Sequence, residues 1–450
     1  MSSFKSQTVS AISFLCFCVF VFVAGLIVAL QGLFPYPYFE QAKAGFEAWQ
    51  QAREETSDHP QLNFEVPDFE GTMVTDRYGN PDEGQRFLVV GGPRLLADET
   101  YPDGVIAWVM DRDGNVLQRW PWKPEVWENP SHVNGLINEN SFYPMCARAF
   151  PDGSLLVSYQ AFGVFPFAAG LAMFDRDGTL RWKKEDNYHH WFTIGDDGLI
   201  YTCAMGLLDE PKPLGDSTLQ IEASPENLVY SDVVRVLNRQ GEVLDEFNIV
   251  DTLAASGYYV GNSMSGFSEW DGMDITHLNF VEALPADMAD AYPGLNAGDL
   301  LISLRNVSTV FIMDRETREV KWIRTGRFVR QHCARFDGRG HIYVFDNRGG
   351  NRKRNMSRIV KLDYSSNQLD VVYPSGEEDV PFAFYNGEEG YYEFSEDGKH
   401  LLFALSYRGR AGELDLETGE LLWRYTNNHV CDGKLGRFKV STISYYPAAE

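Results

Sequence analysis

Residues 107–120 have the sequence A-W-V-M-D-R-D-G-N-V-L-Q-R-W, and residues 171–182 repeat its pattern as L-A-M-F-D-R-D-G-T-L-R-W. In each stretch an apolar strand-like run enters an Asp-Gly turn, and a second run ends in Trp. Two such runs around an Asp-Gly pair predict a β-hairpin. Four further stretches follow the same plan, with a turn built on Asp or Asn, namely residues 233–247, 310–322, 359–372 and 411–423.

A second kind of hairpin lies between most of these repeats. It also has a Gly-containing turn between two alternating runs, as in residues 147–158, 192–202, 334–345 and 392–403. Two hairpins make a unit of four strands, and six copies of a four-stranded unit predict a β-propeller. We therefore expect an all-β fold, a six-bladed β-propeller of four-stranded blades.

The composition supports a globular protein and excludes some classes of function. The chain has 450 residues, of which 44% are hydrophobic and 14% aromatic, enough for a large core. Phosphate-binding loops and dinucleotide-binding glycine motifs that mark doubly wound α/β enzymes are absent from the sequence. A net charge of -25 and a pI near 4.7 argue against a nucleic-acid partner.

The N-terminal region is apolar enough to enter a membrane. Residues 11–34 are almost continuously apolar, follow Lys5 and precede the aromatic segment 35–38. A run of this length exceeds the roughly 20 residues needed to span a bilayer. A cleaved signal peptide is the alternative, but the apolar run is long for one and no clear cleavage site follows. We expect an uncleaved signal anchor in the inner membrane, single-pass, with the rest of the chain in the periplasm.

These patterns divide the chain into three parts. Residues 1–35 form the cytoplasmic tip and the transmembrane helix, residues 36–84 a juxtamembrane helix and a linker, and residues 85–450 the propeller. A propeller closes when an early strand pairs with a late one, and residues 86–90 and 438–445 are the predicted closing strands. The four Trp residues that end hairpins are expected to pack between blades, namely Trp120, Trp182, Trp322 and Trp423.

The cysteines leave the redox chemistry open. Four lie in the predicted propeller and none of these forms a C-x-x-C motif, which argues against a zinc ribbon. A periplasmic protein can form disulfides, but sequence spacing does not determine pairing. A catalytic thiol at Cys333 is a weaker alternative to a buried structural role.

Histidines and positive charge gather in one stretch. His277 and His332 each precede a strand-like run, and ten Lys and Arg residues but only two acids lie between Arg324 and Arg358. The pair His189-His190 precedes a similar run. Neutral imidazoles beside guanidinium groups suit an anionic group such as a sulfate or phosphate. Recurrence at one position of the repeat predicts that these histidines meet at one mouth of the propeller.

Short motifs in this stretch resemble those of the bacterial arylsulfotransferase family. The similarity covers most of the chain from about residue 85 to 430. The motifs occur in this order: D-x-x-H-x-N (Asp274, His277, Asn279), S-x-R-N-x-S (Ser303, Arg305, Asn306, Ser308), Q-H (Gln331, His332), F-D-N (Phe345, Asp346, Asn347) and S-R-x-V (Ser357, Arg358, Val360).

The resemblance implies a periplasmic propeller that moves a sulfuryl group from a phenolic sulfate to a phenol through a sulfo-histidine. It implies no nucleotide donor such as PAPS, and we expect neither a cofactor nor a metal. Matching motifs assign catalytic roles to His277, His332, Asn279 and Arg358. The expected substrate-binding residues are His189, His190, Arg305, Asn347, Arg348, Arg352 and Tyr407.

The sequence departs from the family at one important position. The family's nucleophilic histidine lies in the blade after the F-D-N segment, where this chain has only His400, at a hairpin turn. The expected mouth positions there are occupied by Tyr385, Asn386, Glu388 and Tyr407. Either another histidine is the nucleophile, from among His332, His277, His189 and His190, or the transfer chemistry is lost.

Three functions therefore stay open. The first is a membrane-anchored aryl sulfotransferase, with a phenolic sulfate donor and a phenol acceptor as partners. The second is a non-catalytic propeller that serves as a docking subunit of a membrane protein assembly, since a fold alone does not determine function. The third is a propeller that senses a sugar or an anion.

Overall fold

The turns of the repeats connect antiparallel strands, as predicted. The turn after β4 (Val105–Met110) leads into β5 (Val116–Pro121), and its Gly114 has a φ of 83°, which glycine adopts without steric cost. The computed structural model describes residues 14, 16–25, 63–65, 71–92, 95–127, 142–161, 167–208, 210, 221, 223, 228–258, 274–347, 356–366, 368–375, 384–431 and 433–446.

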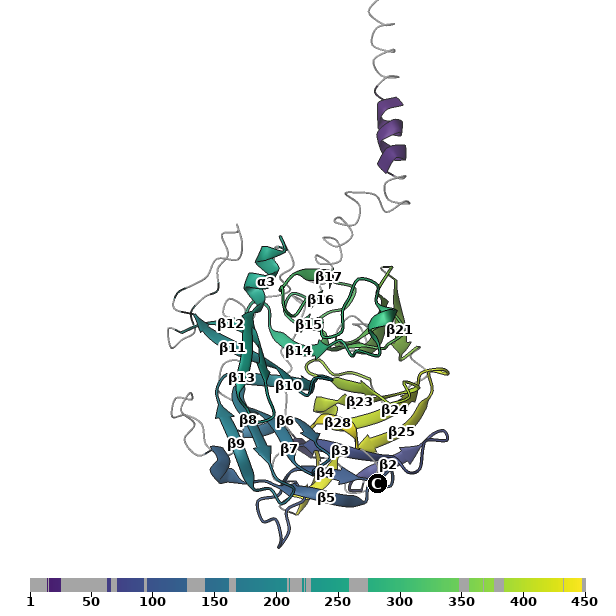
Figure 1. Cartoon of the computed structure of the whole chain (residues 1–450). Helices are drawn as coiled ribbons and strands as arrows, with labels where there is room; N and C mark the ends of the chain where they lie inside the picture. Colours follow the sequence, from purple (N-terminus) through teal and green to yellow (C-terminus); the bar gives the residue numbers. More distant parts are fainter. Residues whose placement is uncertain are drawn as a thin grey trace, which may run out of the picture.

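Six antiparallel sheets surround a central axis, which confirms the six-bladed propeller of four-stranded blades (Figure 1). The blades are, from the axis outward, β28 (Val440–Tyr446), β3 (Arg86–Gly91), β4 and β5; β6 (Phe142–Ala149), β7 (Leu155–Ala161), β8 (Ala168–Phe174) and β9 (Leu180–Glu185); β10 (Tyr188–Ile194), β11 (Ile200–Leu208), β12 (Val229–Leu237) and β13 (Val243–Asn248); β14 (Leu278–Ala283), β15 (Leu300–Leu304), β16 (Thr309–Met313) and β17 (Val320–Thr325); β18 (His332–Phe336), β19 (His341–Asp346), β20 (Arg358–Asp363) and β21 (Leu369–Tyr373); β22 (Tyr391–Phe394), β23 (His400–Leu405), β24 (Arg410–Asp415) and β25 (Leu421–Thr426).

The ring closes through the last strand of the chain. β28 pairs antiparallel with β3, from Val440 opposite Gly91 to Tyr446 opposite Arg86, which confirms the predicted closing strands. In Figure 1 the yellow β28 lies beside the blue-purple β3. The innermost strands also contact one another in sequence around the axis, so that β28 lies between β22 and β6.

Two strands precede the first blade strand in the chain. β2 (Val74–Arg77) pairs with β25 as a fifth, outermost strand of the sixth blade. β1 (Asn63–Glu65) pairs with β27 (Lys434–Phe438), which pairs in turn with β26 (Asn428–Cys431). Parts of the segment expected to be a linker are therefore tied to the propeller by main-chain hydrogen bonds.

Tryptophans join neighbouring blades, as predicted. The indole N–H of Trp182 donates to the carbonyl of Arg239 in the next blade at 3.0 Å. The indole N–H of Trp423 in the sixth blade donates to the carbonyl of Arg112 in the first blade at 3.0 Å. The Trp423 ring also stacks on Phe87, with centroids 4.6 Å apart. These contacts combine apolar burial with a satisfied indole donor.

Helices are few in the described chain. One α-helix, α3 (Ile249–Ala255), follows β13 and is capped by the Asn248 side chain, and short 3-10 helices occur at Pro124–Trp127, Ala289–Ala291 and Ser406–Arg408. Residues 16–25 of the predicted anchor are also helical. No helix among the described residues is long and apolar enough to cross a membrane. The rest of the predicted anchor and the predicted helix at 41–55 lie outside the described residues.

Three of the four propeller cysteines are fully buried. Cys146, Cys203 and Cys333 are buried thiols, and Cys431 is half-buried. Burial raises the pKa of Cys333 to about 12, and its thiol donates to the carbonyl of Tyr392. A thiol with a raised pKa is a poor nucleophile, so the weaker alternative of a catalytic Cys333 is not supported.

A buried ion pair lies beside the closing strand. Lys439, directly before β28, is fully buried, and its ammonium lies 2.5 Å from the carboxylate of Glu389, before β22. The ammonium also lies over the rings of Tyr143 and Tyr407, at 4.5 and 4.8 Å from their centroids. Tyr407 donates its hydroxyl to the same carboxylate at 2.9 Å. The pair links the first and sixth blades at the axis.

Deleting residues 438–450 should abolish cooperative folding. The deletion removes β28 and exposes the edge of β3 and both neighbouring inner strands. The expected result is a shallow thermal transition in circular dichroism in place of the sharp transition of the parent. Cooperative melting at the parent temperature would show that the ring does not need this strand.

Breaking the Lys439–Glu389 pair from one side should destabilise the propeller strongly. Lys439→Met leaves a buried, uncompensated carboxylate, and the expected cost is about 3–5 kcal/mol in denaturant unfolding. Lys439→Met combined with Glu389→Gln should recover most of the loss. Lys399→Met is the control, because Lys399 and Asp397 are exposed and 3.6 Å apart, and it should change stability by less than about 1 kcal/mol.

Candidate functional site

One end of the inner strands carries the polar side chains of the axis. His190 lies near the start of β10, His277 directly before β14, and His332 is the first residue of β18. Glu389 and Lys439 occupy similar places before β22 and β28. Neighbouring inner strands contact one another around the ring, and His190 lies close to both His277 and His332.

The backbone at this end departs from regular strand geometry. His190, His277 and Cys333 have positive φ values of 57°, 53° and 51°, a region that residues other than glycine seldom adopt. β-Bulges re-aim side chains and break the alternation of faces. Five of the six inner strands shift register against their neighbour near this end, at His189/Phe192, Leu278/Phe280, His332/Arg335, Pro144/Cys146 and Val440/Thr442.

Three imidazoles form a continuous hydrogen-bonded chain. The Nδ1 atoms of His189 and His190 are 2.6 Å apart, although adjacent residues of a regular strand point to opposite faces. The Nε2 atoms of His190 and His277 are 3.2 Å apart. The Nδ1 atom of His277 contacts a carboxylate oxygen of Asp274. The ring planes meet nearly at right angles at both imidazole contacts.

The segment that carries His277 is held by the turn between β15 and β16. The main-chain N–H of Arg305 donates to the carbonyl of His277 at 3.0 Å, and that of Asn306 donates to the carbonyl of Thr276 at 3.1 Å. The side-chain amide of Asn306 donates to the carbonyl of Asp274. The S-x-R-N-x-S motif therefore positions the D-x-x-H-x-N motif.

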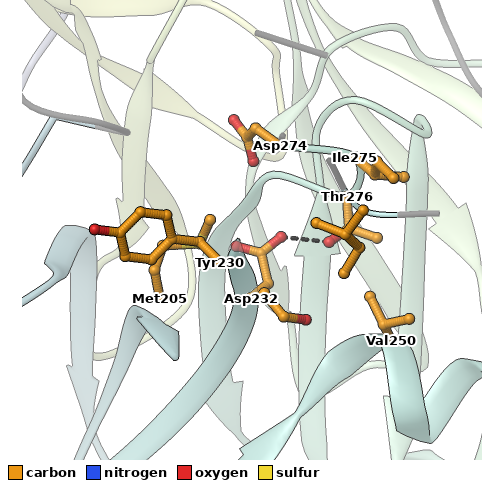
Figure 2. A pocket seen from close by; sticks show the side chains of 9 residues that line it. Met205, Tyr230, Asp232, Val250, Asp274, Ile275 and Thr276 are labelled. Carbon is orange, nitrogen blue, oxygen red and sulfur yellow. Dashed lines mark hydrogen bonds between the residues drawn. The ribbon is translucent and has the colours of Figure 1, made fainter. Parts of the chain in front are cut away.

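A second buried carboxylate lies beside Asp274. Asp232, on β12, accepts the hydroxyl of Thr276 and, at 2.9 Å, the main-chain N–H of Leu278. Figure 2 shows Asp232 bonded to Thr276, with Asp274 above them. A cavity of about 10 Å³, the space of one water molecule, is lined by Met205, Ile221, Tyr230, Ser231, Asp232, Val250, Asp274, Ile275 and Thr276.

His332 is oriented by an anchored amide. Its Nδ1 lies 2.7 Å from the Oδ1 atom of Asn347, whose amide nitrogen donates to the carbonyls of Asn386 and Glu389. Because that nitrogen is occupied, Oδ1 accepts from Nδ1–H, and the lone pair of His332 resides on Nε2. The ring lies 6.3 Å from that of His190, between centroids.

Positive charge borders the imidazoles. Arg305 is 9% exposed, and its guanidinium donates to the side chains of Asn306 at 2.8 Å and Glu388 at 3.3 Å. Its charge lowers the pKa of both His277 and His332, after the larger effect of burial. Arg330 is also buried and acts on His277 in the same direction.

Burial keeps the site close to electrical neutrality. It lowers the pKa of His189 to about 3, and it lowers the pKa values of His190, His277 and His332 well below the usual histidine value. All four imidazoles are therefore neutral near pH 7. Burial also raises the pKa values of Asp232 and Asp274 to about 7.

The structure brings most of the predicted residues to this mouth. His189, His190, His277, His332, Arg305 and Asn347 gather there, and the amide of Asn279 donates to the carbonyl of Gln331 at 2.7 Å. Tyr407 lies at the Glu389–Lys439 pair.

The remaining predicted residues lie elsewhere. Arg358 begins the third strand of its blade, where its guanidinium bonds Asp346 and the carbonyl of Arg327, both at 2.7 Å. Arg358 therefore bonds to its own blade rather than to a histidine, and Arg305 and Arg330 are the guanidinium groups that act on His277. Arg348 and Arg352 lie outside the described residues.

Sequence reasoning missed four residues as members of the site: Asp232, Arg330, Glu389 and Lys439. Asp274 was noticed only as part of a motif. The ion pair had a signal in the sequence, because a charged residue precedes the last inner strand just as a histidine precedes others. Asp232 had no such signal, since it lies on the third strand of its blade.

The arrangement suits the transfer of an anionic group. Neutral imidazole nitrogens offer lone pairs to an electrophilic centre, and the Arg305 guanidinium provides charge for its oxygens. No group of His, Cys, Asp and Glu among the described residues is arranged to hold a metal ion.

Solved structures of similar fold share little sequence with this chain. No curated protein matches the chain. Similar solved structures include a protein of unknown function from Bacteroides caccae (15% identity, 76% of this chain and 93% of that chain, TM-score 0.44), the hydrazine synthase of Kuenenia stuttgartiensis (12%, 70% and 72%, 0.38) and a functionally unknown protein from Desulfotomaculum acetoxidans (10%, 75% and 77%, 0.37).

The model of the arylsulfotransferase (ASST) family matches residues 147–428, more than half of the chain. This range contains the four clustered histidines, Asp274 and Arg305. The chain therefore belongs to the arylsulfotransferase family.

Proposed function

We propose that this protein transfers a sulfuryl group from a phenolic sulfate to a phenol at the mouth of the propeller. The observation that carries the proposal is the cluster of neutral imidazoles around His190, bordered by Arg305. A sulfuryl group has three anionic oxygens around an electrophilic sulfur, so it requires both a nucleophilic lone pair and nearby positive charge.

His332 is the nucleophile in this proposal. Its Nδ1–H is committed to Asn347, so its Nε2 carries the lone pair. Nε2 attacks sulfur, the N–S bond forms, and the S–O bond to the donor phenol breaks with its electron pair on the phenolate oxygen. In the second half-reaction the acceptor phenol oxygen attacks sulfur, and the N–S bond breaks with its electron pair on Nε2. The proton that the acceptor gives up balances the one that the donor phenolate takes up. Arg305 stabilises the sulfuryl oxygens throughout.

The location of the reaction is part of the same proposal. Residues 11–34 anchor the chain in the inner membrane, and the propeller faces the periplasm. Sulfate esters of phenols and free phenols reach it there without a nucleotide donor.

The alternative is a docking subunit without transfer activity. It is favoured by the Glu389–Lys439 pair, which occupies the blade where the family carries its nucleophilic histidine. In this pair the Glu389 carboxylate is bonded to Lys439 and Tyr407, and no imidazole nitrogen is present to attack sulfur.

Transfer by the full-length chain should be measurable with 4-nitrophenyl sulfate as donor and a phenol as acceptor. We expect nitrophenolate release that depends on the phenol, and a loss of more than about 10³-fold in His332→Ala, because the nucleophile is removed. His400→Ala is the control and should retain the parent rate. His400 is the first residue of β23, after the hairpin turn that joins β22 to β23.

Absence of release over a panel of phenols, from protein shown to be folded, would favour the docking alternative. Full activity in His332→Ala would instead move the nucleophile to another histidine while leaving the transfer reaction in place.

The first half-reaction with 4-nitrophenyl sulfate should be insensitive to mild acid. Burial lowers the folded-state pKa of His332, so its imidazole stays neutral as the pH falls through 6.5. We expect the burst rate to stay nearly constant from pH 7.5 to 5.5. A histidine with an ordinary pKa would lose about tenfold over this range, so such a drop would contradict a neutral, desolvated nucleophile.

A further inference from the structure

Sulfuryl transfer between phenols also requires a group that donates a proton and takes one back. A donor phenolate is a poor leaving group unless it receives a proton, and the acceptor phenol must lose one. His332 supplies a lone pair and Arg305 supplies charge, but neither handles this proton. The bond changes described above assign no proton to the imidazole chain or to Asp274.

The contacts of the chain determine where its protons reside. Each nitrogen–nitrogen contact requires one donor and one acceptor. With Asp274 ionised, His277 Nδ1–H donates to the carboxylate, His190 Nε2–H donates to His277, and His189 Nδ1–H donates to His190. With Asp274 protonated, its O–H donates to His277 Nδ1, and every hydrogen bond along the chain reverses.

The Nε2 atoms of His190 and His277 face each other at 3.2 Å, and the ring centroid of His332 lies 6.3 Å from that of His190. In the protonated state the His277 Nε2 carries the proton. The ionised state leaves that nitrogen with a lone pair. The protonation state of Asp274 therefore determines whether His277 Nε2 can donate a proton or accept one.

The surroundings of Asp274 allow both states near neutral pH. Burial opposes ionisation of Asp274, while Arg305, Arg330 and a main-chain hydrogen bond from His277 favour it, and Asp274 in turn raises the pKa of the neighbouring Asp232 on β12. His277 faces the same two guanidiniums and Glu388, and His189 faces Arg235. One oxygen each of Asp232 and Asp274 is buried without a hydrogen bond to the described residues, and both side chains line the water-sized cavity of Figure 2.

We propose, on the basis of the proposed function, that Asp274 acts through His277 as the acid–base of the sulfuryl transfer. When the S–O bond breaks, His277 Nε2–H passes to the donor phenolate oxygen while the Asp274 O–H passes to His277 Nδ1. The acceptor phenol then returns a proton to Nε2, and Nδ1–H returns to Asp274. No proton is gained or lost over the full cycle.

Asp274→Asn tests this role through the choice of donor. The amide oxygen still accepts from His277 Nδ1–H, but it cannot store a proton. For an aryl sulfate whose phenol has a pKa of about 10, like tyrosine, the burst rate should fall more than about 100-fold. For 4-nitrophenyl sulfate, whose leaving phenolate is stable, it should stay within about threefold of the parent. Equal losses with both donors would overturn the proposal.

Asp232→Asn is the matched control, because it makes the same chemical change at the neighbouring buried carboxylate. The hydrogen bonds of Asp232 go to Thr276 and to the main chain rather than to an imidazole nitrogen, so this variant should change the ratio of the two burst rates far less than Asp274→Asn does, whatever its effect on their size. A donor-dependent loss as large as that of Asp274→Asn would assign the proton to the wrong carboxylate and overturn the role of Asp274.

A measurement without substrate separates this proposal from the proposed function. In the full-length protein with ¹⁵N-labelled histidine, NMR distinguishes Nδ1–H from Nε2–H. Between about pH 5 and 9, His277 and His189 should exchange tautomers together, and Asp274→Asn should abolish the exchange. His277 with Nδ1–H at both extremes would overturn the proposal, even if sulfuryl transfer is observed. Absence of transfer together with the exchange would overturn only the proposed function.

Discussion

The pairing of β28 with β3 is the constraint on which the rest of the structure depends. It joins the two ends of the propeller and forces six inner strands to share one axis. Their N-terminal ends then meet at one mouth, where His190 contacts His277 and Lys439 pairs with Glu389 although these partners are far apart in sequence. Several blades supply groups to the mouth, and no single blade forms the site alone.

Because the inner strands meet at one mouth, the side chains there are also buried away from water. Desolvation disfavours charge, so the four histidines are neutral and the carboxyls of Asp232 and Asp274 are hard to ionise. On the opposite side of the axis two charged groups are buried, and the pairing of Lys439 with Glu389 offsets the desolvation cost of both. The mouth therefore has two halves. One is neutral and rich in imidazole, and in the other Lys439 pairs with Glu389 beside Tyr143 and Tyr407, so that only the first offers imidazole nitrogens.

Local backbone distortion completes the site. The bulges near the ends of the inner strands and the positive φ values at His190 and His277 turn side chains out of the alternating pattern. Without them His189 and His190 would face opposite sides of the blade, and the chain of three imidazoles would be broken. Backbone strain of this kind persists where the surrounding packing holds it, here through the turn at Arg305 and Asn306.

The sequence by itself determined the blades, their number, the closing strands and the histidines of the mouth, because these follow from local patterns: a period of two, Asp-Gly turns, Trp at hairpin ends and one repeated position. Only the tertiary structure decided which partners those histidines have. The imidazole chain, the Asp274 contact and the Glu389–Lys439 pair depend on bulges and on neighbours far apart in sequence, and periodicity carries no information about either. The same reason explains why Arg358 was wrongly predicted to lie beside the histidines. It belongs to a motif of the family, but it lies on the third strand of its blade, where it bonds to Asp346.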